Sequence, residues 1–104
     1  MSAKILLAAR YAANHGDWRS AENLYRQILN HDSENEDALN GIADALYFQG
    51  RLAEAETDYR TAVFSNPTNL DLRILLARFY LRLEYDQMAL NVLEYVLEIG
   101  RAHV

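Results

Sequence analysis

Three histidines and one acidic stretch are the residues of this chain best suited to hold a metal ion. The histidines, His15, His31 and His103, lie far apart in the sequence and do not form the closely grouped ligand set of a zinc site. The stretch HDSENED at residues 31–37 gathers four carboxylates, but it lacks the glycine at the sixth place and the closing glutamate of a calcium-binding loop. We therefore expect no bound metal ion. We interpret the stretch as a turn whose acids suit the start of a helix.

The sequence also lacks a recognisable set of catalytic residues. The 104-residue chain contains no cysteine, which excludes thiolate chemistry and disulfide bonds. The sequence has no glycine-rich loop that could cradle a phosphate and no nucleophile with an evident base. We therefore predict a protein that is not an enzyme and has no cofactor.

Charge and hydropathy narrow the classes of partner. The formal net charge is −5 at pH 7, whereas a nucleic-acid-binding surface needs an excess of basic residues. No apolar run approaches the length that crosses a bilayer, and residues 1–10 do not read as a signal peptide, so we expect no membrane insertion and favour a cytoplasmic location. Hydrophobic residues make up 51% of the chain and charged residues 24%, which is typical of one globular domain, here residues 1–104.

A period of 34 residues runs through the chain and defines the elements that must position these side chains. The small residues that recur at this spacing form two series: Ala9, Ala43 and Ala77, then Ala21, Ala55 and Ala89. Tyr25 and Tyr59 keep the same spacing, as do Gly16 and Gly50, with Glu84 as the exception in the third place. So many coincidences at one period indicate a tandem repeat.

Each repeat is expected to contain two helices. In the middle repeat apolar residues recur every three or four positions over residues 39–46 and again over residues 52–63. Gly50 separates the two segments, and Pro67 ends the second because proline cannot continue a helix. The sequence therefore predicts six helices, near residues 3–15, 18–30, 36–48, 52–64, 70–82 and 86–99.

The small residues are explained by the packing of the paired helices. We expect Ala43 and Ala55 to face each other across the turn, where their size lets two antiparallel helices approach closely. Leucine at either position would overpack this contact, typically at a cost of ~1–3 kcal/mol. Trp18, Tyr25 and Tyr59 also match packing positions of the repeat, so we predict that these three rings belong to the core.

With this pattern the chain resembles the tetratricopeptide repeat family over nearly its whole length. The repeat at residues 36–69 carries the most signature residues: Leu39, Ile42, Ala43, Leu46, Gly50, Leu52, Ala55, Tyr59, Ala62 and Pro67. The repeats at residues 2–35 and 70–103 are less complete, with Ser33 in place of the proline and Glu84 in place of the glycine. The resemblance implies an all-α fold, a right-handed superhelix of three antiparallel helix pairs.

The resemblance also implies a concave groove, lined by the first helix of each pair, that binds a peptide or a partner protein. By helical geometry the following residues would line it: Leu6, Arg10, Asn14, Asn40, Asp44, Tyr47, Phe48, Ile74, Arg78 and Arg82. Adjacent aromatic residues on a helix cannot both point inward, so at least one of Tyr47 and Phe48 should be accessible to solvent. Arg10, Asp44 and Arg78 share one repeat position, and we expect Asp44 to lie between the two arginines.

One specialisation of the family does not fit. Lysine and asparagine side chains at fixed groove positions hold the C-terminal carboxylate of heat-shock chaperones, whereas the matching positions here are Leu6, Arg10, Gly41, Asp71 and Leu75. An apolar or amphipathic segment with a few charges fits this groove better. Two alternatives stay open: a dedicated chaperone for a secreted bacterial protein, and an assembly unit or excised part of a longer repeat array.

The last predicted helix is unusually apolar. Its polar residues form one narrow stripe, and four of its apolar residues cannot all pack inside the third repeat: Leu90, Val92, Leu97 and Ile99. Terminal repeats usually present a polar outer face, and an exposed apolar face usually marks an interface. We therefore predict that this helix mediates self-association, most simply as a two-fold homodimer. The alternative is a longer array whose natural cap is missing.

Overall fold

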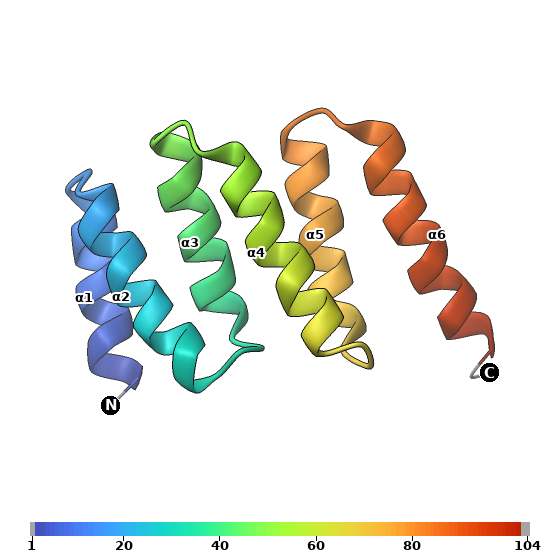
Figure 1. Ribbon diagram of the computed structural model, residues 1–104, viewed down its shortest axis with the longest axis horizontal. Coiled ribbons are helices and arrows are strands. Elements are labelled where there is room, and N and C mark those ends of the chain that lie inside the picture. Colours follow the sequence, from blue (N-terminus) through green and yellow to red (C-terminus); the bar gives the residue numbers. More distant parts are fainter. Residues whose placement is uncertain (1, 103–104) are drawn as a thin grey trace. The chain divides into compact units, whose positions relative to one another are not determined.

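The computed structural model describes the backbone of residues 2–102 and the side chains of residues 3–99. Six α-helices make up this part of the chain (Figure 1): α1 (Ser2–Asn14), α2 (Trp18–His31), α3 (Glu36–Phe48), α4 (Leu52–Ser65), α5 (Leu70–Arg82) and α6 (Asp86–Ala102). These bounds confirm the six predicted helices to within one residue, except that α6 extends to Ala102. The fold is all-α, a helical repeat.

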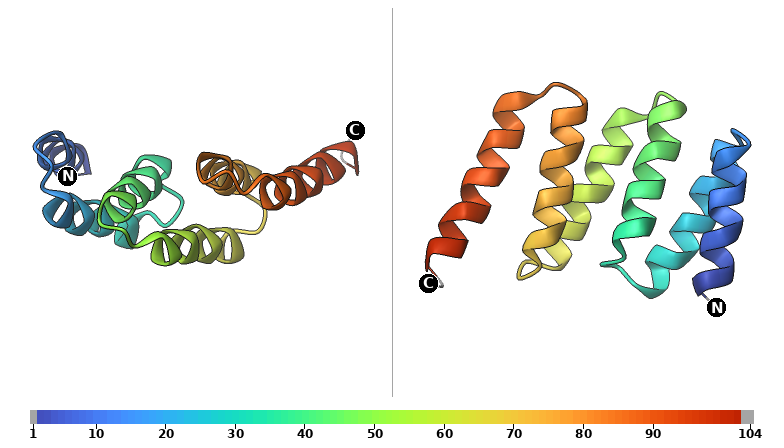
Figure 2. Two further views of the ribbon diagram at one scale, coloured as in Figure 1. Left: turned by 90° about the horizontal axis from the view of Figure 1, so that it is seen from above. Right: turned by 180° about the vertical axis from the view of Figure 1, so that it is seen from behind.

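The chain forms two compact units, Met1–Asp58 and Tyr59–Val104, and the division falls inside α4. In the first unit α2 runs antiparallel to both α1 and α3 and packs against both (Figure 2). In the second unit α5 packs against α6, again antiparallel (Figure 2). The grouping of both units into one domain, residues 1–104, stays a prediction.

The turns inside the three helix pairs share one backbone conformation. At the turn between α3 and α4, Gly50 has a φ of +75°, and the amide of Arg51 donates to the carbonyl of Leu46 at 2.8 Å. This is the hydrogen bond of a Schellman turn, which needs a left-handed residue at its centre. Gly16 has a φ of +74° in the first turn, and Glu84 has a φ of +62° in the third. The third repeat therefore keeps the turn although it lacks the glycine.

Side-chain caps begin three of the helices. Asp17 caps α2, Asn35 caps α3 and Asn69 caps α5, each accepting a hydrogen bond from a backbone N–H in the first turn. The acidic stretch 31–37 forms the turn between α2 and α3, and two of its acids lie in the first turn of α3. The interpretation of this stretch as an inter-repeat turn is therefore confirmed.

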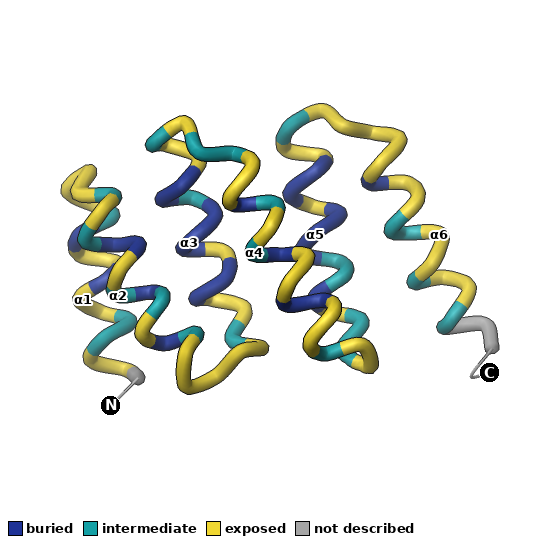
Figure 3. The backbone as a smooth tube through the Cα atoms, in the orientation of Figure 1, coloured by how far each residue is buried: buried dark blue, intermediate teal, exposed yellow. Residues whose placement is uncertain are grey.

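The core of the first unit contains most of the residues predicted for it. Ala43 and Ala55 are buried, as is Tyr25, while Trp18 is only half-buried, so the prediction that its ring belongs to the core is corrected. Figure 3 shows buried residues gathered along α3. The largest buried side chains of α3 are Leu39, Ile42 and Leu46.

Gly41 lets the ring of Tyr25 lie directly against the backbone of α3. A Cβ atom added at Gly41 would lie 2.4 Å from two carbons of the Tyr25 ring, well inside van der Waals contact. Glycine inside a helix is about 1 kcal/mol less favourable than alanine. The close approach of the ring is therefore the physical reason for glycine at this position.

The core of the second unit is built mainly on α5. The ring centroids of Tyr59 and Phe79 lie 5.2 Å apart, and both side chains are buried. Over residues 86–99 of α6, whose side chains are described, only Ala89 is buried (Figure 3). Leu90 is 47% exposed and Leu97 is 57% exposed, while Val92 and Ile99 are half-buried. The prediction that these four side chains are not all buried inside the third repeat is confirmed.

Candidate functional site

A hollow of about 240 Å³ opens on the first unit, where residues of α1 and α3 meet the first turns of α2. Its lining consists of Arg10, Ala13, Asn14, Trp18, Tyr25, Gly41 and Asp44. Three of these residues, Arg10, Asn14 and Asp44, were predicted to line the groove. The structure therefore brings together predicted site residues from α1 and α3, and we define this hollow as the first-unit pocket.

Opposite charges lie side by side at the first-unit pocket. The guanidinium of Arg10 lies 3.7 Å from the carboxylate of Asp37, and both side chains are well exposed. An exposed ion pair of this kind contributes only ~0–1 kcal/mol to stability. Arg10 and Asp44 line the same pocket, but Arg78 belongs to the second unit. The alternation of the three charges therefore stays a prediction.

Tyr25 supplies a neutral hydroxyl to the first-unit pocket. Burial raises the pKa of the phenol above its ordinary value; the positive charge of Arg10 lowers this pKa, and the carboxylates of Asp44 and Asp37 raise it. The net effect raises the pKa, so the phenol stays protonated at neutral pH. A neutral tyrosine hydroxyl can both donate and accept a hydrogen bond.

An aromatic cluster continues from the first-unit pocket. The rings of Trp18 and Phe48 stack with centroids 4.5 Å apart and an angle of 14° between their planes. The ring of Tyr47 meets Phe48 edge-on, at 5.3 Å and 82°. Phe48 is 55% exposed and Tyr47 36%, which confirms the predicted solvent-accessible ring. We call these three residues the aromatic cluster.

None of the predicted groove residues is buried. Those that are exposed include Arg10, Asn14, Asn40, Arg78 and Arg82, while Leu6, Asp44 and Ile74 are half-buried. Three of these residues lie on α5 in the second unit: Ile74, Arg78 and Arg82. Their assembly with the first-unit residues into one groove stays a prediction.

A buried carboxylate, Glu22, joins the two repeats of the first unit, and sequence reasoning missed it. Arg26, one turn along α2, donates to this carboxylate at 3.0 Å, and Arg51 donates at 2.7 Å. The amide of Gln49 donates at 3.2 Å. Burial alone would raise the pKa of Glu22, but these hydrogen bonds together outweigh it and hold the pKa below its ordinary value. The carboxylate is therefore ionised and well satisfied.

The two arginines extend this network to α4. Arg26 forms a two-pronged pair with the carboxylate of Asp58, at 3.0 and 3.3 Å. Arg51 also pairs with Glu54. We call these side chains, together with Gln49, the Glu22 network. It ties α2 to the α3–α4 turn and to the start of α4, so it positions the helices that carry the first-unit pocket.

The described part of the chain shows neither a metal-binding cluster nor a spanning helix. Among the described residues, no three His, Cys, Asp or Glu side chains are placed to hold a metal ion. No helix in this range is long and apolar enough to cross a membrane. The ring of His15 lies 2.8 Å from the carbonyl oxygen of Tyr11, His31 is exposed, and His103 lies outside the described residues.

The repeat matches a known protein family. A family model described as tetratricopeptide repeat matches residues 6–69 and, in a second overlapping placement, residues 41–101. Together the two placements cover nearly all of the described residues. No curated protein matches the chain. The match agrees with the 34-residue period and with the six helices of the structure.

Proposed function

Because the chain belongs to the tetratricopeptide repeat family, whose repeats mediate protein–protein interaction, we propose that its first unit binds an amphipathic segment of a partner protein and catalyses no reaction. The observation that carries this proposal is the first-unit pocket. Within one compact unit it combines an exposed arginine, an asparagine, a carboxylate and a neutral tyrosine hydroxyl, and it borders the aromatic cluster.

Affinity would come mainly from the aromatic cluster. Trp18 holds the ring of Phe48 in a fixed orientation, so an apolar side chain of the partner meets a preformed flat surface. Aromatic side chains and arginine are the residues that most often dominate the free energy of binding at protein interfaces. Arg10 and Asn14 would then orient the polar groups of the same segment. In this proposal α5 extends the surface with Ile74, Arg78 and Arg82, and the two units act as one domain.

A matched pair of charge reversals tests this proposal. The full chain and its variants serve as bait, and partners are identified and counted by mass spectrometry. Arg10→Glu should lose the partner, whereas Arg19→Glu should keep it, because Arg19 is an exposed arginine of α2 outside the pocket. Equal recovery of the partner by both variants would contradict the proposal. If the partner is a secreted bacterial protein that is insoluble unless co-expressed with this chain, the scaffold acts as a dedicated chaperone.

Exposed side chains of α6 support a second role in self-association. Leu90 and Leu97 are both about half exposed, and exposed apolar surface of this kind favours an interface. We therefore propose a homodimer formed through α6. Sedimentation velocity should show a dimer that Leu97→Glu converts into a folded monomer, while Glu98→Gln, an exposed neighbour, leaves the dimer intact. A wild-type monomer at high micromolar concentration would refute the dimer.

A further inference from the structure

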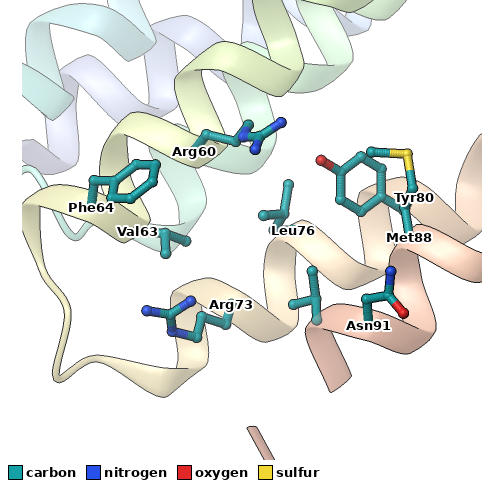
Figure 4. Close-up of a pocket in the computed structure, with 9 residues that line it drawn as sticks. Arg60, Val63, Phe64, Arg73, Leu76, Tyr80, Met88 and Asn91 are labelled. Atoms are coloured by element: carbon teal, nitrogen blue, oxygen red, sulfur yellow. The ribbon is translucent and has the colours of Figure 1, made fainter. Parts of the chain in front are cut away.

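The second unit carries a pocket that sequence reasoning did not predict. It has a volume of about 250 Å³ and is lined by residues of α4, α5 and α6, with Leu76 of α5 in the middle (Figure 4). This volume exceeds the ~150 Å³ of an apolar cavity known to admit benzene. Val63, Leu76 and Val92 give the pocket apolar walls, and two arginines, Arg60 and Arg73, also line it. We call it the second-unit pocket.

The first unit has a hollow at the equivalent repeat position, with different chemistry. There the lining includes Arg26 and two acids, Glu54 and Asp58, and Arg26 forms its two-pronged pair with Asp58. The residue 34 positions after Arg26 is again an arginine, Arg60. The residues 34 positions after the two acids are Met88 and Val92. In the second-unit pocket, apolar side chains therefore stand where the first unit has two carboxylates.

Arg73 adds a second positive charge where the repeat usually places an apolar side chain. The equivalent residue of the middle repeat is Leu39, which is fully buried. The guanidinium carbon of Arg73 lies 4.2 Å from the centre of the Tyr95 ring, so the ring supports one face of the guanidinium. The Nε atom is buried and has no hydrogen-bond partner among the described residues. A buried donor without a partner is unfavourable. Arg73 as a whole is half-buried, so a carboxylate would have to approach the other nitrogens of its guanidinium group.

Accessible apolar side chains belong to the same pocket. Phe64 of α4 is 79% exposed, and Met88 of α6 is also exposed. No aspartate or glutamate occurs among the described residues of the lining, although the whole chain carries a net charge of −5. The described lining therefore combines apolar walls with two arginines and contains no acidic side chain.

We infer that the second-unit pocket is a separate docking site for a partner-protein segment in which an aliphatic or aromatic side chain stands next to an aspartate or glutamate. The apolar side chain packs on Val63, Leu76 and Val92, and the adjacent carboxylate pairs with the guanidinium groups of Arg60 and Arg73. The charge complementarity and the apolar walls both favour this occupant over a basic or a purely polar segment. The site belongs to the second unit and shares no lining residue with the first-unit pocket, so in this inference the chain has two binding surfaces.

The probe for this site is a phage-displayed library of random dodecapeptides, selected on the full-length chain. The enriched sequences should pair Leu, Ile or Phe with a neighbouring Asp or Glu. A fluorescein-labelled peptide of the consensus sequence should then bind in a polarisation assay, and its affinity should fall as the salt concentration rises.

Val92→Asp is the decisive variant because it restores the carboxylate that Asp58 provides in the first unit. It should weaken peptide binding at least tenfold, and its helix content should stay intact because the first unit already accommodates the same arginine–aspartate pair. Arg73→Gln should weaken binding by a similar factor and serves as the second variant if Val92→Asp fails to fold. The control Arg10→Glu, in the first-unit pocket, should leave this affinity unchanged.

Three results would overturn the inference. The first is a selection without acidic–apolar sequences. The second is an affinity that neither Val92→Asp nor Arg73→Gln changes, or that Arg10→Glu abolishes. The third is a change in sedimentation mass caused by Arg73→Gln, because Arg73 lies on α5 outside the predicted α6 interface, and such a change would assign the pocket to a second copy of the chain. Failure of the first-unit proposal would leave these measurements unaffected, since they use a different surface.

Discussion

Replacing Gly41 by alanine tests the close contact between α3 and the ring of Tyr25. Two effects of opposite sign act at this position. Alanine is favoured over glycine in a helix by about 1 kcal/mol. The added Cβ, however, would lie 2.4–2.5 Å from three carbons of the ring. Overpacking of a core costs about 1–3 kcal/mol, and this contact belongs near the upper end because Tyr25 is buried and its ring cannot simply swing into solvent.

The expected net result of Gly41→Ala is a destabilisation of about 1–2 kcal/mol, the overpacking cost less the helix-propensity gain. Urea denaturation followed by circular dichroism measures this free energy of unfolding directly. In a thermal scan the same change lowers Tm by roughly 4–8 °C for each kcal/mol.

A double-mutant cycle with Tyr25→Leu separates the two effects. Removing the aromatic ring removes the clash, so Gly41→Ala should become stabilising by up to about 1 kcal/mol in the Tyr25→Leu background. The two positions should therefore be coupled by about 2–3 kcal/mol, with a change of sign. An alanine at position 41 that stabilises the otherwise wild-type chain, or that has the same effect in both backgrounds, would refute the proposed role of this glycine.

Three further predictions concern the turn, the buried carboxylate and the aromatic cluster. Glu84→Gly should raise the free energy of unfolding by about 0.5–1 kcal/mol in urea denaturation, because Glu84 has a φ of +62° and glycine adopts this conformation without strain; the mirror change Gly50→Ala should lower it. The pKa of Glu22 is lowered by folding, so its ion pairs stabilise the fold above about pH 4.5 and are lost as the pH falls through the folded pKa. Glu22→Gln should therefore destabilise the chain by roughly 1–3 kcal/mol at pH 7 but much less at pH 3, and an equal loss at both pH values would contradict this role of the charge. Replacing both Tyr47 and Phe48 by alanine should weaken binding of the partner at least tenfold and change Tm little; normal binding with a large loss of Tm would assign both rings to the core.

The helices and most of the core could be predicted because the repeat encodes them locally. Small residues such as Ala43 and Ala55 recur where paired helices touch, and a glycine or proline follows the ends of α1, α3 and α4. Each of these signals acts within a few residues of the structure it determines, so periodicity alone located the six helices. The accessible ring of Phe48 followed in the same way, from its adjacency to Tyr47 on one helix.

The candidate sites were predicted less completely because they depend on partners distant in the sequence. Glu22 was unremarkable as a charged residue of an amphipathic helix, and its burial depends on the amide of Gln49 and the guanidinium of Arg51, 27 and 29 residues away. Trp18 matches a core position of the repeat, yet it lies at the first residue of α2, where its ring remains half-buried beside Phe48. A closer comparison of the repeats would have indicated the second-unit pocket, because Val92 replaces Asp58 at the equivalent repeat position.

The Glu22 network has a consequence for the order of the repeats. The residues 34 positions after Gln49 and Arg51 are Leu83 and Tyr85, neither of which can donate a hydrogen bond from an amide or guanidinium group. A shuffled chain in which the first repeat preceded the third would bury the Glu22 carboxylate opposite leucine and tyrosine, without two of its donors. Leaving a buried charge without its partners is strongly destabilising. Successive repeats of this chain are therefore not interchangeable modules, and any permutation or internal duplication would need new polar residues at the altered junction.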